Sequence, residues 1–573
     1  MNTPDGYAAL VDPQATAADA TTRKVAWVTI PLVLLVFLFG GGFQNLEGDE
    51  VRVAGIAAGM QAGQSSVAVP RLAGREFLEK PPLGFACVAA SFRVLGTSSY
   101  AARLPGLVFG LVGALLLGVL AWDVYGSRAA ALAAALGLLF NAEHFWVARK
   151  CVVDNALAAG VITSVVLFCR AVDRPRQRWL WLPLAASAVA VACLAKGAIG
   201  LVLPALAFAG VLAGRRSLGI LKSGWFWICP LVVAAPLLLW LYAVYAEGGE
   251  AALRIVVVDN HLHRFSPSED YLGGHQRPFW FYVGRLPAVL LPALVFLPAS
   301  LRWHWARLEQ QRIREVLWLS AGWLGLGFVI LSLAGTKRVI YLLPIVAPAP
   351  LLAAGWLASL LEPRPLDRLE AWTLRALVAA VVLGAVGLPV ALALGPDSPP
   401  VWSVAATAIT LGAAGATALA YRSGPRAAFL LGAVLSGALI VAVALQVAGQ
   451  VEERKNSEPR SFYEEVARRV PPGAQVRVFP ASEHGLGAFT YYTGRVPETL
   501  WGTHDEAMRV NLERCRADLR AAKPLFVVVL DKQHRADVPP LWEQLREPGV
   551  HVLAQETRGR WTSTLLANRA ATN

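Results

Sequence analysis

Residues 47–52 read EGDEVR, and residues 69–83 read VPRLAGREFLEKPPL. This charged stretch follows directly on an apolar run at 25–43, which is long enough to cross a bilayer because a spanning helix needs about 20 apolar residues. Most other long segments of the chain are apolar. We therefore expect the stretch to be the first loop outside the cytoplasm of a polytopic α-helical membrane protein, and to carry much of its functional site.

The composition also indicates a membrane protein. Of the 573 residues, 56% are hydrophobic and 16% are charged, whereas about a quarter of the residues in a soluble domain are charged. The formal net charge of +13 would suggest nucleic acid as the partner of a soluble protein. Here the bases fall mostly in short loops between apolar runs, so membrane topology explains them better, and we expect membrane lipids rather than nucleic acid as partners.

The apolar runs predict about thirteen transmembrane helices. They cover residues 25–43, 104–122, 129–147, 152–171, 179–195, 198–213, 224–245, 279–300, 316–333, 340–360, 373–394, 402–421 and 427–448. A further run at 82–95 is short and follows two prolines, which predicts a re-entrant or amphipathic segment beside the membrane rather than a span.

Lysine and arginine residues are concentrated in every second loop, which the positive-inside rule assigns to the cytoplasm. This pattern predicts a cytoplasmic tail at 1–24, a transmembrane domain at 25–450, and loops at 44–103 and 246–278 on the opposite side. Residues 451–573 are mixed polar, with strand-like runs between helix-like runs, and predict a soluble α/β domain. With about thirteen spans this domain lies outside the cytoplasm, although one span more or fewer would reverse its side.

Acidic residues near the outer ends of spans are the first functional candidates. Asp49 and Glu50 follow a span immediately, where a solvated helix end would also carry charge. Asp154 lies at the mouth of an apolar span, where a carboxylate is costly unless it is paired or hydrated. It either forms an ion pair with Arg149 or Lys150, or it belongs to a functional site.

Several basic residues break the positive-inside pattern, because they lie on the outer side. Lys196 interrupts an apolar run, and Lys337 and Arg338 form a pair ahead of another. Lys196 either extends its ammonium group to the membrane interface or binds a phosphate. An anionic lipid phosphate would explain why bases gather at this face.

The loop at 246–278 contains His261, His263 and His275 close to acidic residues. These residue types bind divalent metals, but the loop has no tight ligand motif. The alternative is a mobile loop whose histidines are solvated.

Together these groups fit transfer of a chemical group from a donor that is linked to a lipid phosphate. The donor would lie in the membrane with its phosphate at the outer face, where lysine and arginine would neutralise the leaving phosphate. A carboxylate would orient or deprotonate the acceptor, and a hydrophobic groove between helices would hold the lipid tail.

Eight motifs along the chain resemble those of a known family. They are DEVR at 49–52, VPRL at 69–72, FLEKPPL at 77–83, ARLP at 102–105, RKCVVDNAL at 149–157, AKGA at 195–198, GHQRPFWFY at 274–282 and KRVIYLLP at 337–344. In this order, over most of residues 25–360, they resemble the GT-C glycosyltransferases related to the 4-amino-4-deoxy-L-arabinose transferase of lipid A. That group is akin to the protein O-mannosyltransferases.

The resemblance implies a GT-C fold and a glycosyltransferase in the bacterial inner membrane. It implies that a sugar moves, with inversion, from an undecaprenyl- or other polyprenyl-phosphate donor to an envelope acceptor on the periplasmic side. The domain at 451–573 would lie on that side as well. Val53 stands where the family usually has Tyr, so the acceptor stays open between lipid A, another glycolipid, a polysaccharide and a protein.

The matching positions imply roles for individual residues. Asp49 and Asp154 would be the catalytic carboxylates. The substrate would be bound by Arg52, Lys80, Arg103, Lys196, Lys337, Arg338 and Tyr341. Glu79 and His275 would hold a divalent metal such as Zn, Mg or Mn.

Two other classes of function stay open. A transporter or flippase of lipid-linked sugars would predict inverted repeats and charges near the bilayer centre, whereas the sequence shows no clear repeat and its charges cluster at one face. A structural or sensory membrane protein would have its main function in the tail at 451–573.

Overall fold

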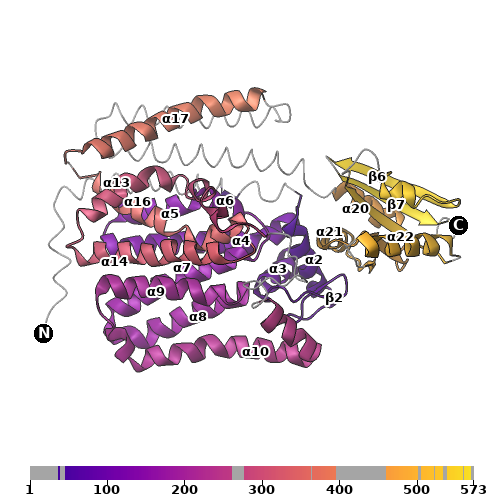
Figure 1. Cartoon of the computed structure of the whole chain (residues 1–573), viewed down its shortest axis with the longest axis horizontal. Helices are drawn as coiled ribbons and strands as arrows, with labels where there is room; N and C mark the ends of the chain where they lie inside the picture. The colour runs from indigo at the N-terminus through magenta and orange to yellow at the C-terminus, as the bar shows by residue number, and fades with distance from the viewer. Residues whose placement is uncertain are drawn as a thin grey trace.

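The structure is a computed structural model in which a helical bundle and a smaller α/β domain lie end to end (Figure 1). It describes residues 37–38, 45–260, 276–362, 364–394, 460–500, 505–521, 523–532, 539–558 and 561–568. The expected tail at 1–24, nearly all of the first expected span, and the expected spans at 402–421 and 427–448 lie outside the described residues.

The first long loop folds into short elements at the end of the bundle that meets the C-terminal domain, here called the domain end. They are α2 (Asp49–Gln61), the antiparallel strands β1 (Arg71–Leu72) and β2 (Arg75–Glu76), and α3 (Leu83–Leu95). With 13 residues, α3 is about 20 Å long and too short to cross a bilayer. A segment beside the membrane was expected at this position.

The helices of the bundle are mostly apolar and are joined by short helical turns. They are α4 (Ser99–Tyr125), α5 (Arg128–Leu139), α6 (Ala142–Ala148), α7 (Asp154–Asp173), α8 (Arg178–Lys196), α9 (Ile199–Arg215), α10 (Gly224–Arg254), α12 (Leu286–Val289), α13 (Ala293–Trp305), α14 (Gln311–Ser320), α15 (Gly327–Leu333), α16 (Pro348–Ser359) and α17 (Arg368–Leu394). The turns are η2 (Pro175–Gln177), η3 (Gly219–Lys222), η4 (Ile255–Asp259), η5 (Phe279–Tyr282), η6 (Ala321–Leu326) and η7 (Val339–Ile345). Within the described residues, five helices are long and apolar enough to cross a membrane, or up to eight if each bent pair counts as one span.

Three of the expected spans are bent rather than straight. The axis turns by 65° between α5 and α6, by 92° between the segments 279–289 and 293–305, and by 49° between η7 and α16. At the first bend Asn141 caps α6, and its amide donates to the carbonyl oxygens of Val289 and Leu291. Pro292 and Pro348 lie at the other two bends, where α13 and α16 begin, and proline suits a helix start because the first N–H groups of a helix have no partner within it.

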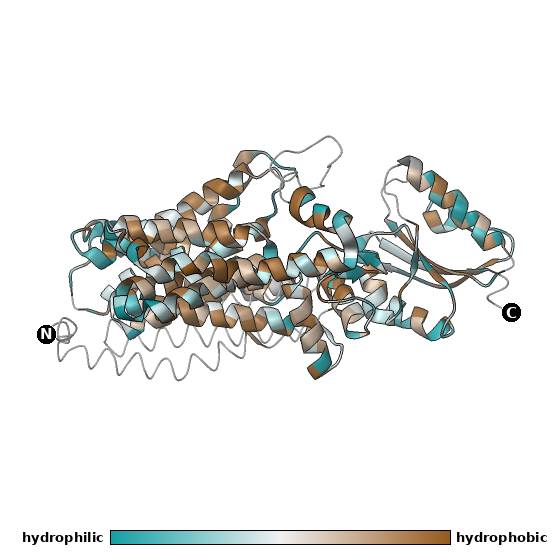
Figure 2. Cartoon of the chain, turned by 90° about the horizontal axis from the view of Figure 1, so that it is seen from below, coloured by the Kyte–Doolittle hydropathy of each residue, from teal (hydrophilic) through white to brown (hydrophobic). Residues whose placement is uncertain are grey.

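Successive helices run between the domain end and the opposite end, here called the far end. α7 leaves the domain end at Asp154, α8 returns to it at Lys196, and α9 leaves it again at Ile199. Figure 2 shows the apolar helices between hydrophilic ends. At the far end Asp173 pairs with Arg215 at 3.0 Å and with Arg312 at 2.7 Å, which ties three helices together.

The C-terminal domain is a five-stranded mixed sheet with helices. Its elements are α20 (Arg460–Arg469), β3 (Val476–Phe479), α21 (Glu483–Thr493), β4 (Glu498–Thr499), α22 (Asp505–Arg520), β5 (Phe526–Lys532), α23 (Leu541–Gln544), β6 (Val550–Arg558) and β7 (Trp561–Asn568). The strand order is β4-β3-β5-β7-β6, parallel from β4 to β5 and antiparallel from β5 to β6. The strand-like runs noted in the sequence correspond to β3, β5 and β6.

One hydrophobic core joins this domain to the first loop. Val51 and Phe85 from the loop belong to the same buried cluster as Tyr463, Phe489 and Val528 from the domain. The two regions are far apart in the sequence, so burial of these side chains fixes the C-terminal domain on α2 and α3.

Candidate active site

Asp49 begins α2 and is held by donors from three parts of the chain. Gly48 precedes it with a φ of 50°, in the left-handed region that favours glycine. Asp49 Oδ1 accepts from Arg52 Nη2 at 2.7 Å, and Oδ2 lies 2.5 Å from Arg338 Nη1. His484 Nε2, in the C-terminal domain, lies 3.5 Å from Oδ1. The carboxylate is thus oriented through both oxygens.

These partners keep Asp49 ionised. Burial raises the pKa of this carboxyl group, but the hydrogen bond with His484 and the charges of Arg52, Lys80 and Arg338 outweigh burial and lower the pKa well below its usual range. Asp49 is therefore a carboxylate at neutral pH, as a proton acceptor must be.

A second acidic residue of α2, Glu50, is part of a buried ion pair. Its two oxygens accept from Arg103 Nε and Nη2, each at 2.8 Å, and one also accepts from the N–H of Cys151 at 2.8 Å. Arg103 also donates to the carbonyl of Asn45. The sequence-based role of Arg103 is substrate binding, whereas the structure places its guanidinium group against the first loop, where it holds α2 on the bundle.

Asp154 and Lys196 meet at the domain end, where α7 begins and α8 ends. Lys196 Nζ donates to Asp154 Oδ1 and lies 3.9 Å from the centre of the Tyr341 ring. An ion pair for Asp154 was one of the alternatives left open by the sequence, but the partner is Lys196, 42 residues away, rather than Arg149 or Lys150. Lys150 instead pairs with Glu47 at 2.7 Å.

Lys80 links the two carboxylates electrostatically. Desolvation and the neighbouring cations Arg52 and Lys196 lower the pKa of Lys80 to about 8, against the opposite effects of Asp49 and Asp154. A lysine held among other cations attracts an additional anion, because the cluster gains by neutralisation. This arrangement favours a phosphate group as a ligand.

Lys337 makes different contacts from those of its neighbour Arg338. Its ammonium group is buried and donates to the carbonyl oxygens of Arg277, at 3.0 Å, and of Ala334. These bonds join the segment before η5 to the segment before η7, and the hydroxyl of Tyr282 donates to the Arg338 carbonyl at 3.1 Å. Lys337 therefore supports the backbone that presents Arg338.

The expected metal ligands are only partly described. Glu79 is exposed next to Lys80, and His275 lies outside the described residues. Among the residues that the structure describes, His, Cys, Asp and Glu side chains form no group of three or more that could hold a metal ion. A divalent metal on Glu79 and His275 therefore stays a prediction.

The sequence did not single out Glu483 and His484. Both lie in the first turn of α21, where Glu483 pairs with Arg52 and His484 contacts Asp49. The tail carries none of the family motifs, and contacts over more than 400 residues of sequence leave no periodic signal. The one local signal was Ser482 followed by Glu483, which is typical of a helix N-terminus.

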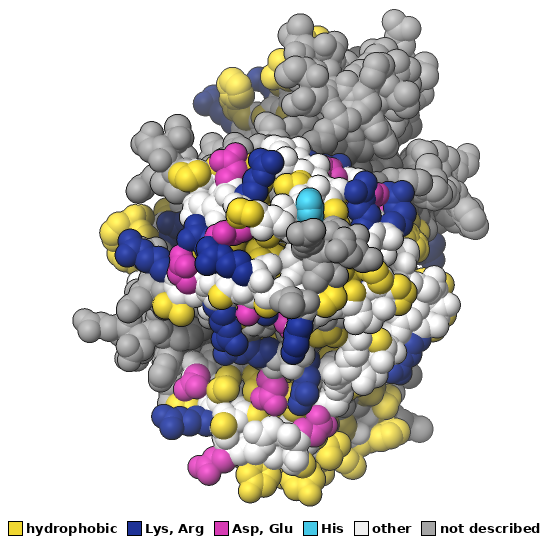
Figure 3. Space-filling view, turned by 90° about the vertical axis from the view of Figure 1, so that its right-hand side faces the viewer, with side chains coloured by type: hydrophobic (Ala, Val, Ile, Leu, Met, Phe, Trp, Pro, Cys, Tyr) yellow, Lys and Arg dark blue, Asp and Glu magenta, His cyan; other side chains and the backbone are white. Residues whose placement is uncertain are grey.

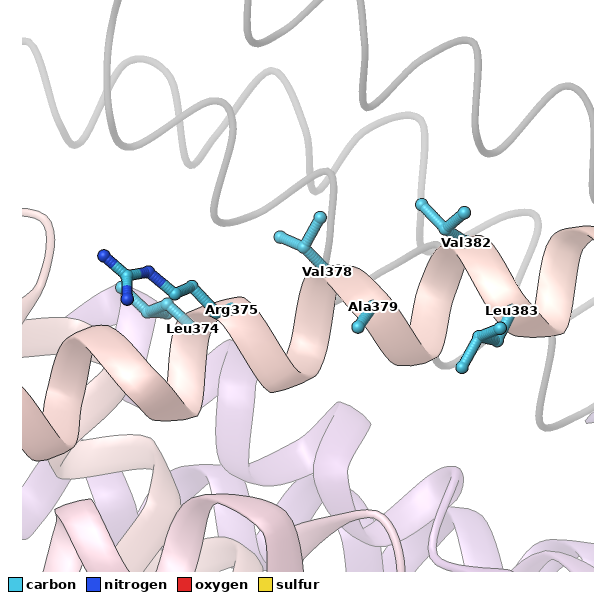
Figure 4. A pocket seen from close by; sticks show the side chains of 6 residues that line it. All are labelled: Leu374, Arg375, Val378, Ala379, Val382 and Leu383. Atoms are coloured by element: carbon cyan, nitrogen blue, oxygen red, sulfur yellow. The ribbon is translucent and has the colours of Figure 1, made fainter.

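Two surface features put the charged cluster in context. Figure 3 shows the molecule from the end that carries the C-terminal domain, and this surface is here called the domain face. Basic and acidic side chains are interspersed on it with smaller apolar areas, which is typical of a surface in contact with water. Figure 4 shows an apolar groove along α17, lined by Leu374, Arg375, Val378, Ala379, Val382 and Leu383. The lining residues that the structure describes all come from α17, and none of them belongs to the charged cluster.

Comparison with solved structures identifies the fold. The structure of ArnT from Cupriavidus metallidurans bound to undecaprenyl phosphate matches with a TM-score of 0.72 at 19% identity, over 94% of this chain and 97% of that chain. The apo structure of the same protein matches with a TM-score of 0.73 at 18% identity, over 96% and 99%. The chain is a multi-pass membrane protein with the GT-C fold.

Comparison of sequences shows which proteins with the GT-C fold this chain is similar to. The family model for dolichyl-phosphate-mannose-protein mannosyltransferase matches residues 79–242. An undecaprenyl phosphate-alpha-4-amino-4-deoxy-L-arabinose arabinosyl transferase from Pectobacterium carotovorum is 29% identical over 375 residues, 63% of this chain and 65% of the relative. The corresponding protein of Pseudomonas aeruginosa PAO1 is 30% identical over 315 residues, 53% of this chain and 54% of the relative.

These matches span less than two thirds of the length of the curated relatives. They confirm the resemblance that the sequence motifs suggested: the chain is similar to the 4-amino-4-deoxy-L-arabinose transferases in sequence and to ArnT in fold.

Proposed function

We propose that the protein is an inverting glycosyltransferase that moves 4-amino-4-deoxy-L-arabinose, or a related sugar, from a polyprenyl-phosphate donor to lipid A or another envelope acceptor. The observation that carries this proposal is the cluster at the domain end, where Asp49 and Asp154 lie among Lys80, Lys196 and Arg338. The names of the relatives and the undecaprenyl phosphate bound to ArnT support the same class of donor.

The cluster can perform the transfer in one displacement. Asp49 accepts the proton of the acceptor hydroxyl, whose oxygen attacks the anomeric carbon on the side opposite the phosphate. The bond between that carbon and the phosphate oxygen breaks, and the configuration inverts. Lys80, Lys196 and Arg338 stabilise the charge on the leaving polyprenyl phosphate.

Other residues of the site act by orienting these groups. Asp154 holds the ammonium group of Lys196 toward the face of Tyr341, and Arg52 holds one oxygen of Asp49. A divalent metal on Glu79 and His275 stays a prediction, and no step of the proposed reaction depends on it.

The proposed membrane arrangement places the domain end in the periplasm of a bacterial inner membrane. About thirteen spans would put the tail at 1–24 in the cytoplasm and the soluble domain at 451–573 in the periplasm. The mixed charges on the domain face and the Arg-rich network at the far end support this orientation. A transporter is less consistent with the charged cluster, because the ion pairs lie at helix ends rather than near the middle of a span.

An assay of the purified full-length protein tests the proposal. With a polyprenyl-phosphate-linked aminosugar and lipid A, mass spectrometry is expected to detect the glycosylated lipid. Asp49→Asn is expected to abolish transfer, because an amide cannot take up the acceptor proton. Glu309→Gln, which changes an exposed carboxylate at the far end, is the matched control. Wild-type turnover by Asp49→Asn would contradict the role of Asp49, and movement of the lipid-linked sugar without any product would favour a flippase.

A further inference from the structure

The C-terminal domain contributes side chains to the candidate active site. The hydroxyl of Ser482 caps α21 by accepting from the N–H of Gly485 at 3.1 Å, which places Glu483 and His484 in the first helical turn. From there Glu483 pairs with Arg52, and His484 Nε2 reaches Asp49 Oδ1. Since a carboxylate only accepts, the imidazole N–H is the donor in this contact.

Close packing fixes the position of α21 relative to Asp49. A Cβ atom added at Gly487 would lie 2.6 Å from both the Arg52 Cα atom and the Val51 carbonyl oxygen, so the two helices touch through their backbones. Farther along α21, the hydroxyl of Tyr492 accepts from the N–H of Leu46 at 3.2 Å. The first turn of α21 is therefore held over Asp49 by contacts on two sides.

The two oxygens of Asp49 face partners of different kinds. Oδ1 contacts Arg52 and His484, which the crossing of α2 and α21 holds in place. Oδ2 contacts Arg338, whose side chain is one third exposed and which the proposed reaction assigns to the donor phosphate. On the proposed function, a donor phosphate would draw Arg338 away from Oδ2, whereas Oδ1 would keep its contacts with Arg52 and His484.

We propose that His484 is a positioning residue of the transfer reaction. Together with Arg52 it fixes Oδ1 of Asp49, so that Oδ2 is the oxygen that accepts the proton of the acceptor hydroxyl. This inference rests on the proposed function and adds to it that the active site is shared between the membrane domain and the C-terminal domain.

Steady-state kinetics of full-length variants test the inference. His484→Ala is expected to lower kcat about 10-fold, the effect of one hydrogen bond to a charged group, with KM for the donor within about twofold of wild type. His484→Gln is expected to recover most of the lost kcat, because its amide group also donates. His551→Ala, an exposed histidine on β6 of the same domain, is the control and should match wild type.

The outcomes separate the two proposals. Wild-type kcat in His484→Ala, together with an inactive Asp49→Asn, would overturn the role of His484 and leave the proposed function intact. Equal losses in His484→Ala and His484→Gln with lowered melting temperatures in both would show a structural role and would also overturn it. If the wild-type protein forms no glycosylated product from the polyprenyl-phosphate-linked aminosugar and lipid A, the proposed function fails. The positioning role of His484 then fails with it.

Discussion

At the scale of single residues, Lys80 is the group through which the two carboxylates interact. It carries its charge among Arg52 and Lys196, and desolvation and these cations set its pKa at about 8 rather than near the 10.5 of an exposed lysine. The resemblance of the motif at 77–83 to the family implied a substrate-binding role for Lys80. It did not predict the lowered pKa, which depends on neighbours brought in from α2 and α8.

The pH dependence of the reaction follows from this pKa. Below about pH 8 the ammonium group of Lys80 is protonated, which its proposed role in phosphate binding requires, and as the pH rises through 8 the protonated fraction falls. We therefore expect kcat/KM for the donor to decrease about tenfold per unit above pH 8, since kcat/KM reports the free enzyme. Lys80→Arg should remove this alkaline decrease, because a guanidinium group stays protonated. An unchanged alkaline limb in Lys80→Arg would assign the titration to another group.

Sequence reasoning found the residues of the site that lie close to family motifs. It correctly grouped Asp49, Lys80, Asp154 and Lys196 on one face by following the alternation of loops, and the structure brings them to the domain end. It could not find His484, because 435 residues separate it from Asp49 and only tertiary packing brings the two together.

At the scale of elements, the crossing of α2 and α21 decides how the C-terminal domain is placed. Gly55 and Gly487 face each other, and a Cβ atom at Gly55 would lie 2.6 Å from the Gly487 carbonyl oxygen. Glycine at both positions lets the two helices approach until their backbones touch. The same approach brings the first turn of α21 within reach of Asp49 and Arg52.

Gly487→Ala is expected to lower both stability and activity. In an open helix the change would stabilise by up to about 1 kcal/mol, because alanine is the better helix former. Here the added methyl group meets backbone atoms that cannot move aside, and overpacking of this kind costs about 1–3 kcal/mol. The melting temperature in detergent and kcat should both fall, whereas Gly224→Ala, at the open start of α10 with no atom within 4 Å, should leave kcat unchanged and should not lower the melting temperature. Full activity of Gly487→Ala would contradict this prediction, because it would show that α2 and α21 can move apart without loss of function.

The bends in the bundle show where the sequence was least informative. The run at 129–147 was expected to be one span because most of its residues are apolar. Asn141 instead ends the first half, since its side chain caps α6 and also bonds to the carbonyls of the neighbouring segment. A hydropathy pattern shows that Asn141 is polar, but it does not show that its side chain will bond to backbone carbonyls about 150 residues away.

At the scale of the whole molecule, the charged groups lie at the two ends of the helices, one set at the domain end and another at the far end. α7, α8 and α9 each have one terminus at the cluster of Asp154 and Lys196 and the other near Asp173 or Arg215. This sorting follows from the alternation of apolar runs with charged loops, and it is the part of the architecture that the sequence predicted best. The described residues include five helices that could cross a membrane, or up to eight if each bent pair counts as one span.

Accessibility labelling tests the proposed orientation of the two ends. In a background without the six native cysteines, Thr97→Cys marks an exposed position between α3 and α4 at the domain end. Ser217→Cys marks an exposed position after α9 at the far end. In spheroplasts a membrane-impermeant maleimide should label the Thr97→Cys variant at once and the Ser217→Cys variant only after lysis. Immediate labelling of Ser217→Cys and labelling of Thr97→Cys only after lysis would show the opposite orientation, with the domain end and the proposed reaction on the cytoplasmic side.

The bond between His484 and Asp49 also has a consequence for biogenesis. Chains are made from the N-terminus, so the helices of the bundle enter the membrane before the ribosome has reached codon 484. Until the C-terminal domain has folded and has docked on α2, a newly inserted chain holds Asp49 without its imidazole partner and with an open hydrophobic core on α2 and α3. The candidate site is therefore completed only in the last step of synthesis, and a ribosome that stops early leaves a membrane protein whose Asp49 lacks the contact with His484.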